Sequence, residues 1–254
     1  MGVSMSYRIK IKPLTQLWTG DEERKSGVLR ETGIIGSLRW WYEALIRSLD
    51  GTACDPTNNR KERCEGKNHC DACELFGCSG WARKFKLDIK KSDDEVIFKI
   101  IELKEMDDIE FGLLNKTFKI IEDYGALGGK LAERNYGIIK IEENGLEKFQ
   151  PKKNKIKKYI KKGGSTVDDP NFKRFVFIKK GLNLQFVKKL KEECTFLKGK
   201  PGKGKRYFYK TLNNKPYRLF IQVKDDEEYK EVLNFVKKHN VEFIEGKELL
   251  EGLL

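Results

Sequence analysis

Five of the six cysteines in this chain lie between Cys54 and Cys78. Cys70 and Cys73 form a Cys-x-x-Cys pair, and Cys64 and Cys54 precede it on a polar, turn-rich stretch. Two residues of spacer let both sulfurs point into the same turn, so thiolates with this spacing can converge on one tetrahedral ion. Soft sulfur ligands in a four-fold cage favour zinc. The spacing therefore predicts a structural zinc site, because four protein ligands leave no open position for a reactive water.

The favoured ligands are the four cysteines that precede an apolar Leu-Phe-Gly segment, namely Cys54, Cys64, Cys70 and Cys73. Cys78 follows that segment and could substitute for the first of them. His69 is a further candidate ligand, although the cysteine beside it suits the ion better. Clustered cysteines of this kind indicate metal ligands before disulfides in a reducing cytosol.

The charge of the chain points to polyanionic partners. Its formal net charge is +13, from 52 Lys and Arg against 39 Asp and Glu. A field of this sign attracts nucleic acid first and an anionic membrane surface second. A solvated, lysine-rich surface would explain the same composition. No apolar stretch is long enough to span a bilayer and the start of the chain has no apolar export segment, so we expect a cytoplasmic protein.

Two places carry candidate RNA contacts. Arg39 flanks the apolar stripe of an expected helix, where it could hold a phosphate or face solvent, and Trp40 lies on the opposite face. Trp40 is interpreted as buried under the cysteine insertion or a neighbouring loop, or as a platform for base stacking or partner docking. The glycine-rich stretch 125–137 joins a helix to a strand and contains Lys130 and Arg134. It could grip an RNA backbone or be an ordinary tight turn.

Catalytic machinery is sparse. The chain has two histidines, and neither lies near a nucleophile signature. Asp21 belongs to an acidic loop that could bind a divalent ion, although a solvated loop explains it as well. Arg24 and Lys25 follow in the same loop as weaker candidates for RNA contacts. The sequence therefore favours a binding protein without an enzymatic activity or a small-molecule substrate.

The first half of the chain predicts a split β-α-β pattern, which is the order of a ferredoxin-like domain. Alternating or helical apolar periodicity marks each element. The expected order is a strand at 7–13, a helix at 32–49, strands at 83–89 and 96–103, a helix at 108–124 and a strand at 136–141. Trp41 falls in the apolar stripe of the first helix and is expected in the core. The cysteine-rich insertion, 51–80, follows that helix.

The second half repeats the same order of elements. It predicts strands at 175–178, 206–210, 217–223 and 241–244, with helices at 183–191 and 225–239. A basic stretch at 150–170, which includes the lysine run from Lys152 to Lys162, is expected to be a mobile loop or linker. We therefore expect an α+β protein of two ferredoxin-like domains, 1–148 and 149–254, of which the first carries the insertion.

Three sequence motifs resemble the RAMP superfamily of CRISPR-associated RNA-binding proteins. The first is the segment 32–41, which is similar to the family's first helix ending in Arg-Trp-Trp. The second is Cys70-x-x-Cys73 followed by Leu-Phe-Gly at 75–77. The third is the segment 128–137, which resembles the family's glycine-rich loop, although Ala132-Glu133 stands where a more basic loop is usual. The resemblance covers about the first 140 residues. Within the superfamily, the chain is most similar to the first RAMP subunit of the Cmr complex, the type III-B effector.

This resemblance implies a non-catalytic subunit near the crRNA 3′ end of a multisubunit interference complex. Its expected partners are crRNA, the paired target RNA and other Cmr subunits. Contacts would come from Arg39, Lys130 and Arg134, with Trp40, Arg24 and Lys25 as weaker candidates. The alternative is a RAMP-family metal-dependent endoribonuclease that uses a loop acid such as Asp21.

Overall fold

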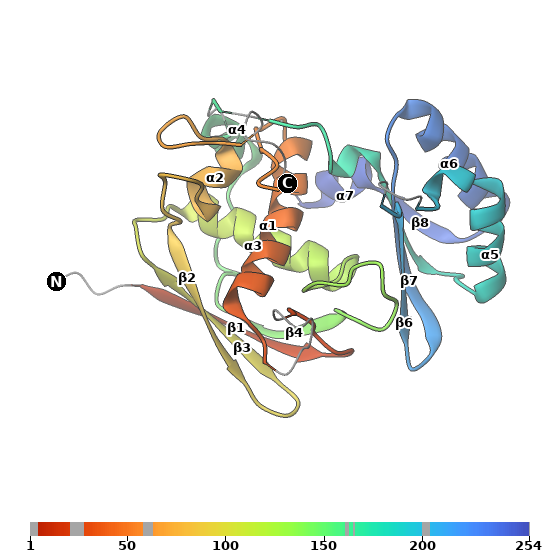
Figure 1. Ribbon diagram of the computed structural model, residues 1–254, viewed down its shortest axis with the longest axis horizontal. Coiled ribbons are helices and arrows are strands. Elements are labelled where there is room, and N and C mark those ends of the chain that lie inside the picture. Colours follow the sequence, from red (N-terminus) through yellow and green to blue (C-terminus); the bar gives the residue numbers. More distant parts are fainter. Residues whose placement is uncertain are drawn as a thin grey trace.

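The computed structural model describes residues 5–20, 28–57, 63–160, 163–164, 166–199 and 204–253. Each half of the chain builds one four-stranded antiparallel sheet with helices against it (Figure 1). The first half contains β1 (Ser6–Pro13), α1 (Glu31–Ser48), α2 (Asp71–Phe76), β2 (Phe85–Lys91), β3 (Val96–Glu102), α3 (Asp108–Asp123) and β4 (Ile139–Asn144). The second half contains α4 (Lys153–Tyr159), β5 (Phe175–Lys180), α5 (Leu184–Glu193), β6 (Tyr207–Leu212), β7 (Lys215–Gln222), α6 (Asp226–Lys238), β8 (Glu242–Glu245) and α7 (Gly246–Leu253).

The two sheets have the same topology. Their strand orders are β2-β3-β1-β4 and β6-β7-β5-β8, so in each sheet the first strand lies between the third and the fourth. The neighbouring strands within each sheet are antiparallel. This is the arrangement of the split β-α-β pattern. The prediction of an α+β protein with two ferredoxin-like domains, the first carrying the cysteine cluster, is confirmed.

Side-chain periodicity explains how the first half builds its core. In β1, Ile9 and Ile11 are fully buried under the helices, while Arg8 beside them points to the other face of the sheet. Such alternation is what one buried sheet face requires. On α1 the apolar residues recur at helical spacing, and Trp41 is fully buried with its indole N–H donating to the carbonyl of Ala126 at 2.9 Å. The indole of Trp41 therefore joins α1 to the segment that follows α3.

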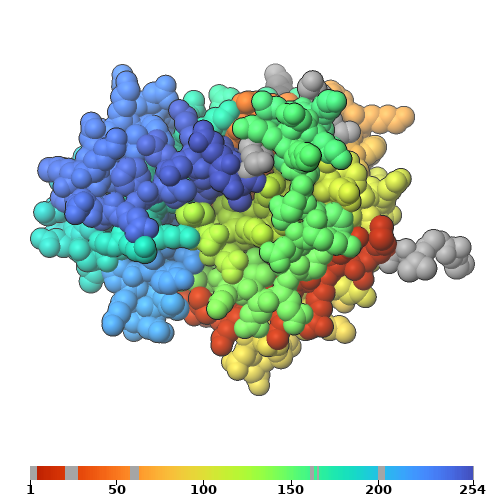
Figure 2. Space-filling model, turned by 180° about the vertical axis from the view of Figure 1, so that it is seen from behind, coloured from red at the N-terminus to blue at the C-terminus, as the bar shows by residue number. Residues whose placement is uncertain are grey.

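The second sheet is covered on both faces. Val176 and Ile178 of β5 pack towards α5 and α6, whereas Phe175 and Phe177, which alternate with them, belong to the core of the first half. Phe220 of β7 lies 5.3 Å from the Trp41 ring, measured between ring centroids. Figure 2 shows the second half, in cyan and blue, lying directly against the first. The face of the second sheet that its own helices leave open is thus filled by the first half.

The prediction that 150–170 is a mobile loop or linker is wrong for its first part, which forms α4. Ile156 is 1% exposed, and the Tyr159 hydroxyl donates to Glu110 Oε1 of α3 at 2.7 Å. One buried face is enough to fix a short helix, even though the lysines on its other face dominate the composition. Residues 161, 162 and 165 lie outside the described part of the chain, and the boundary at 148/149 stays a prediction. Among the helices that the structure describes, none combines the length and the apolar composition needed to cross a bilayer.

Candidate functional site

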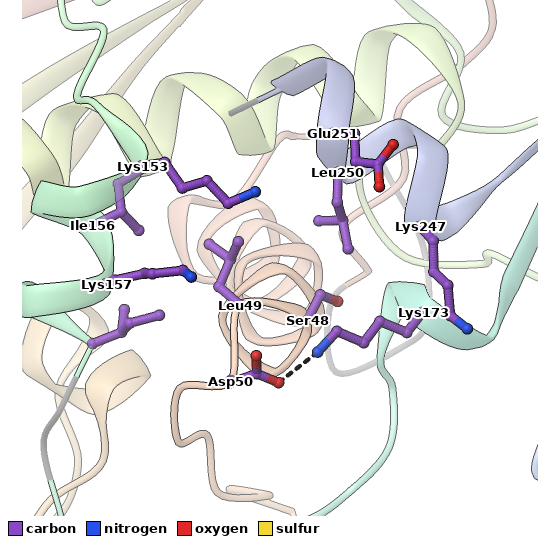
Figure 3. A pocket seen from close by; sticks show the side chains of 11 residues that line it. Ser48, Leu49, Asp50, Lys153, Ile156, Lys157, Lys173, Lys247, Leu250 and Glu251 are labelled. Atoms are coloured by element: carbon purple, nitrogen blue, oxygen red, sulfur yellow. Dashed lines mark hydrogen bonds and ion pairs between the residues drawn. The ribbon is translucent and has the colours of Figure 1, made fainter.

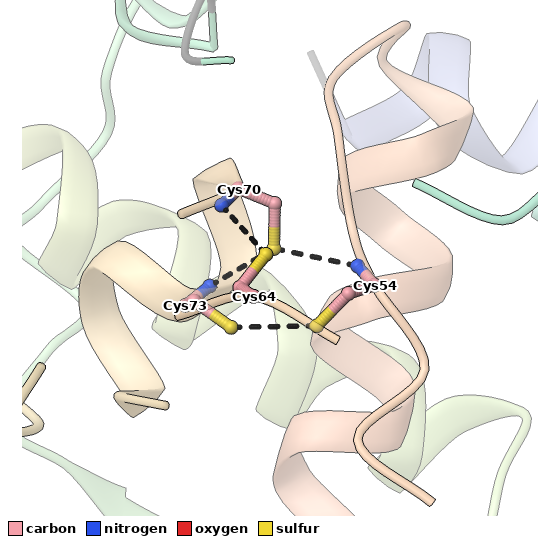
Figure 4. A group of neighbouring side chains, drawn as sticks. All are labelled: Cys54, Cys64, Cys70 and Cys73. Carbon is pink, nitrogen blue, oxygen red and sulfur yellow. Dashed lines mark hydrogen bonds between the residues drawn. The ribbon is translucent and has the colours of Figure 1, made fainter. Parts of the chain in front are cut away.

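The four favoured cysteines form one cluster beside α1 (Figure 4). The sulfurs of Cys54, Cys64, Cys70 and Cys73 all lie within 4.8 Å of one another, and all four side chains are buried. Each is a free thiol. Sulfurs bound to one tetrahedral zinc lie roughly 3.8 Å apart, given Zn–S bonds of about 2.3 Å. The donor set and its spacing therefore fit a zinc ion.

Backbone geometry positions these sulfurs. Cys70 is the N-cap of α2, and its Sγ accepts hydrogen bonds from the backbone N–H of Cys73 at 3.4 Å and of Cys54 at 3.3 Å. The N–H of Cys70 in turn donates to Cys64 Sγ at 3.2 Å. Hydrogen bonds from N–H groups stabilise negative charge on sulfur. These N–H groups therefore favour negative charge on the sulfurs of Cys64 and Cys70, which metal binding requires.

Crowded thiolates repel one another unless a cation lies between them. The pKa of Cys70 is raised above its ordinary value, above all by its hydrogen bond with Cys54 and also by burial. Metal binding needs deprotonated thiols and releases their protons. A divalent ion would remove this repulsion, which is the physical reason to expect one here.

Arg39 lies against the cluster, at a hollow that Cys54, Cys64 and Cys78 also line. Its side chain is 13% exposed, and Nε donates to Glu43 at 2.6 Å. Nη1 donates to the carbonyl of Gly77 at 2.8 Å, and Nη2 to Cys73 Sγ at 3.1 Å. Burial opposes its charge, but Glu43 and Cys73 outweigh that effect and raise the pKa of Arg39. This environment favours a structural role for Arg39 over contact with a phosphate.

A second arginine of α1 completes the attachment of the loop. Arg47 is 5% exposed and donates to the carbonyls of Ala53 and Cys54 and, across the chain, of Pro170. Sequence reasoning missed it. The only sign of its role in the sequence is spacing. Glu43 lies four residues after Arg39 and four before Arg47, so the three side chains share one helix face and form two ion pairs.

The alternative ligands are not members of the four-sulfur group, although Cys78 is near enough to interact with Cys73. Cys78 is half-buried, and its thiol lies 3.7 Å from the carbonyl of Ser79. Both ring nitrogens of His69 are occupied, by the carbonyl of Gly66 at 2.9 Å and by Glu74 at 2.6 Å. The geometry thus favours the four cysteines over either substitute. That they hold zinc stays a prediction.

Trp40 is half-buried at the junction of the two halves. Its ring makes edge contacts with Trp41 at 4.9 Å and with Phe175 of β5 at 6.4 Å, both between centroids. These contacts match the interpretation of Trp40 as covered by another part of the chain, although that part is β5 and not the cysteine insertion.

Of the predicted contacts that lie within the described residues, Lys130 and Arg134 are the two that are exposed. Lys130 has a positive φ of 55°, and its ammonium lies 4.8 Å from the Trp18 ring. A Cβ on Gly129 would meet that ring at 2.6 Å, and one on Gly125 would meet Trp41 at 2.5 Å. The glycines are therefore needed for close packing on tryptophans, and the loop is a firm support for its two cations.

The second half of the chain anchors this loop. The N–H of Thr211 in β6 donates to the carbonyl of Arg134 at 2.9 Å. The fully buried Lys210 donates to the carbonyl of Glu133 at 2.8 Å. Arg134 is thereby held beside the edge strand of the second sheet. Sequence reasoning did not foresee this, because no motif links β6 to the loop.

A hollow with several lysines lies at the C-terminal end of α1 (Figure 3). It has a volume of about 280 Å³, and Lys153 and Lys157 reach it from α4. Lys173 pairs there with Asp50 at 2.5 Å. The glycine-rich loop instead contacts the first half of α1, where Gly128 N–H donates to Ser37 Oγ at 2.9 Å. The two basic surfaces are therefore separate.

Three predicted site residues have no position in the structure. Asp21, Arg24 and Lys25 lie outside the described residues, so the acidic loop and its two cations stay predictions. Within the described ranges, the four-cysteine cluster is the only group of three or more His, Cys, Asp or Glu residues placed to hold a metal ion.

The comparisons with known proteins agree with this architecture. No curated protein matches the sequence. The structure is similar to the crystal structure of Cmr1 from Pyrococcus furiosus in its apo form, with a TM-score of 0.51 and 12% sequence identity over 94% of this chain and 98% of that one. At this identity the likeness shows the fold. The family model of the RAMP superfamily matches residues 10–252, nearly the whole chain, and the protein therefore belongs to the RAMP superfamily.

Proposed function

We propose that this protein is a non-catalytic, RNA-binding subunit of a type III-B CRISPR (Cmr) effector complex. Its partners would be crRNA or crRNA paired with target RNA, near the crRNA 3′ end, together with other Cmr subunits. Membership of the RAMP superfamily and the fold shared with Cmr1 support the assembly. The net charge of +13 supports a polyanionic ligand.

The observation that carries the proposal is the glycine-rich loop, which presents Lys130 and Arg134 to solvent on a rigid support. An anchored loop backbone lowers the cost of ordering the loop when its cations bind a phosphate. Phosphate contacts supply affinity and carry no sequence information. Recognition should therefore depend steeply on salt and weakly on sequence, because base pairing carries the sequence information in RNA-guided systems.

The test is binding of a fluorescent single-stranded RNA to the purified 254-residue chain over a range of salt concentrations. Lys130→Ala with Arg134→Ala should weaken binding and reduce the slope of log K against log salt by roughly 1.4, that is, about 0.7 for each phosphate that is no longer neutralised. Lys230→Ala with Lys237→Ala is the matched control, because it removes two exposed lysines of α6. Equal losses in both double variants would contradict the loop as the contact site.

The rival function is an endoribonuclease that uses Asp21. The same RNA, incubated with the wild-type chain and Mg²⁺, should remain intact. Cleavage that Asp21→Ala abolishes would establish the enzyme and overturn the non-catalytic assignment.

A further inference from the structure

A groove of about 380 Å³ lies where the glycine-rich loop meets the second half of the chain. Its cations are Arg134 from the loop, Lys188 and Lys191 from α5, and Lys205 from the segment before β6. Tyr207 and Tyr209 of β6 also line it. Neither the resemblance nor the family match assigns a role to these residues of the second half.

The chain brings these side chains together by ordinary periodicity. On α5 the lining residues are Leu184, Val187, Lys188 and Lys191, which share one helix face at spacings of three and four. On β6, Tyr207 and Tyr209 are two residues apart and share one sheet face. β6 is the edge strand of its sheet, and its end is the place where the loop carbonyl of Arg134 is held.

Charge in the groove is mostly positive. Four cations line it, and Glu133 is the one acidic residue among its described lining. Lys205 lies 6.0 Å from the Tyr207 ring, which is half-buried and presents an aromatic surface. Cations beside aromatic rings are the usual means of holding a single-stranded nucleic acid. The groove therefore combines the two kinds of side chain that a strand of RNA requires.

Tyr209 supplies an independent sign of a ligand. Its side chain lines the groove and is 8% exposed, yet its buried hydroxyl has no hydrogen-bond partner among the described residues. Buried polar groups in folded proteins are almost always hydrogen-bonded, so an unpaired hydroxyl in such a place needs an explanation. Burial raises the pKa of Tyr209, and the charge of Arg134, which lines the same groove, acts in the opposite direction.

We infer that this groove binds a backbone phosphate and its neighbouring base of a single-stranded RNA, continuing the track that begins at Lys130. Lys188, Lys191 and Arg134 bind the phosphate, the Tyr209 hydroxyl donates to a phosphate oxygen, and the Tyr207 ring contacts the base. The inference rests on the proposed function and extends the RNA contact from the first half of the chain to the second.

The electrostatic part is tested with Lys188→Ala and Lys191→Ala together. In the RNA-binding assay with the full chain, this variant should bind about tenfold more weakly at low salt, and its salt slope should fall by roughly 0.7, because the two lysines share one phosphate. The control is the pair Lys230→Ala and Lys237→Ala on α6, which changes the net charge by the same amount.

The Tyr209→Phe variant gives a sharper test, because two readouts should move in opposite directions. Removing an unpaired buried hydroxyl should raise the melting temperature of the free protein. Losing its hydrogen bond to phosphate should weaken RNA binding several-fold with no change in salt slope. Tyr229→Phe is the matched control, because that hydroxyl already donates to Glu245 at 2.7 Å, and its removal should lower the melting temperature and spare binding.

The outcomes separate the two proposals. If the α5 variant and Tyr209→Phe bind RNA like their controls while the loop variant of Lys130 and Arg134 is weakened, the groove inference is overturned and the proposed function stands. If the wild-type chain binds no RNA at low salt, both are overturned.

Discussion

Several cations of this basic chain are used inside the fold. Arg39 donates to the carbonyl of Gly77, and Arg47 to that of Ala53. Arg218 of β7 donates to the carbonyl of Glu122 at 2.6 Å at the end of α3, where a cation also complements the helix dipole. Lys210 donates to the carbonyl of Glu133. Each of these side chains holds a loop or a helix end, so any RNA contact must come from the exposed cations that remain.

Lys210 gives a prediction on pH. It is fully buried, and burial lowers its pKa from 10.5 to about 8. Below pH 8 both the folded and the unfolded chain carry the proton, and the folded state bears the full penalty of the buried charge. Between the two pKa values the unfolded chain binds more protons, so the free energy of unfolding should rise with pH. The rise should be on the order of 3 kcal/mol, given about 1.4 kcal/mol per pKa unit.

The measurement is urea unfolding of the wild type and of Lys210→Met at about pH 8 and about pH 10.5, the two ends of the range set by the pKa values of Lys210. Other lysines, tyrosines and thiols titrate over the same range, so the readout is the difference between the two proteins. The stability of the wild type relative to the variant should increase with pH. A difference that stays constant or falls would contradict a depressed pKa at Lys210.

At the scale of elements, periodicity predicted most of the fold. The alternation of Ile9 and Ile11 with charged residues correctly predicted β1, and the apolar stripe that contains Trp41 correctly predicted α1. The helices α2, α4 and α7 were not predicted, because each has at most eight residues and too few turns for a pattern to emerge. In α4 only Ile156 is buried, so composition suggested a loop. Contacts across the halves, such as Thr211 with Arg134, depend on tertiary packing that no local pattern encodes.

The candidate site was predictable to different degrees. Cysteine spacing selected the four residues that the structure brings together, because a Cys-x-x-Cys pair constrains its own geometry. The role of Arg39 could not be read from the sequence, since a helix face shows only which side a residue lies on and not what packs there. Lys188 and Lys191 carried a weak signal, their shared helix face, which has no meaning until the groove is formed.

The cysteine loop gives a prediction on metal removal. The loop and the six-residue α2 have little regular structure of their own, so an ion should supply much of their stability. Purified protein should contain one zinc per chain, and a chelator should lower its melting temperature. Binding at about a thousandfold excess over Kd stabilises a folded protein by about 4 kcal/mol. Cys64→Ser should lose the metal and show the same lowered melting temperature without chelator.

Cys78→Ser is the matched control for that experiment. Its thiol is half-buried and lies outside the four-sulfur cluster, so the variant should keep its zinc and its melting temperature. Loss of zinc from this variant, with retention in Cys54→Ser, would show that Cys78 replaces Cys54 as a ligand.

At the scale of the whole molecule, the two halves share one core. Phe175, Phe177 and Phe220 of the second sheet are buried against Trp41 and its neighbours in α1. The N-terminal half alone would expose this surface, and a contiguous apolar patch of that kind is rarely left open. Although each half has the topology of a complete domain, we expect them to unfold together.

Calorimetry of paired core variants tests this cooperativity. Phe220 lies at the junction of the halves, and Phe235 of α6 is buried in the core of the second half alone, at 3% exposure. Each change to Ala should destabilise the fold by about 3–5 kcal/mol, the usual range for a buried phenylalanine. If the halves unfold as one unit, the wild type shows a single transition and both variants shift all of it. Two transitions, of which Phe235→Ala lowers only one, would instead mean that the second half unfolds independently and that the shared aromatic core is too weak to couple the halves.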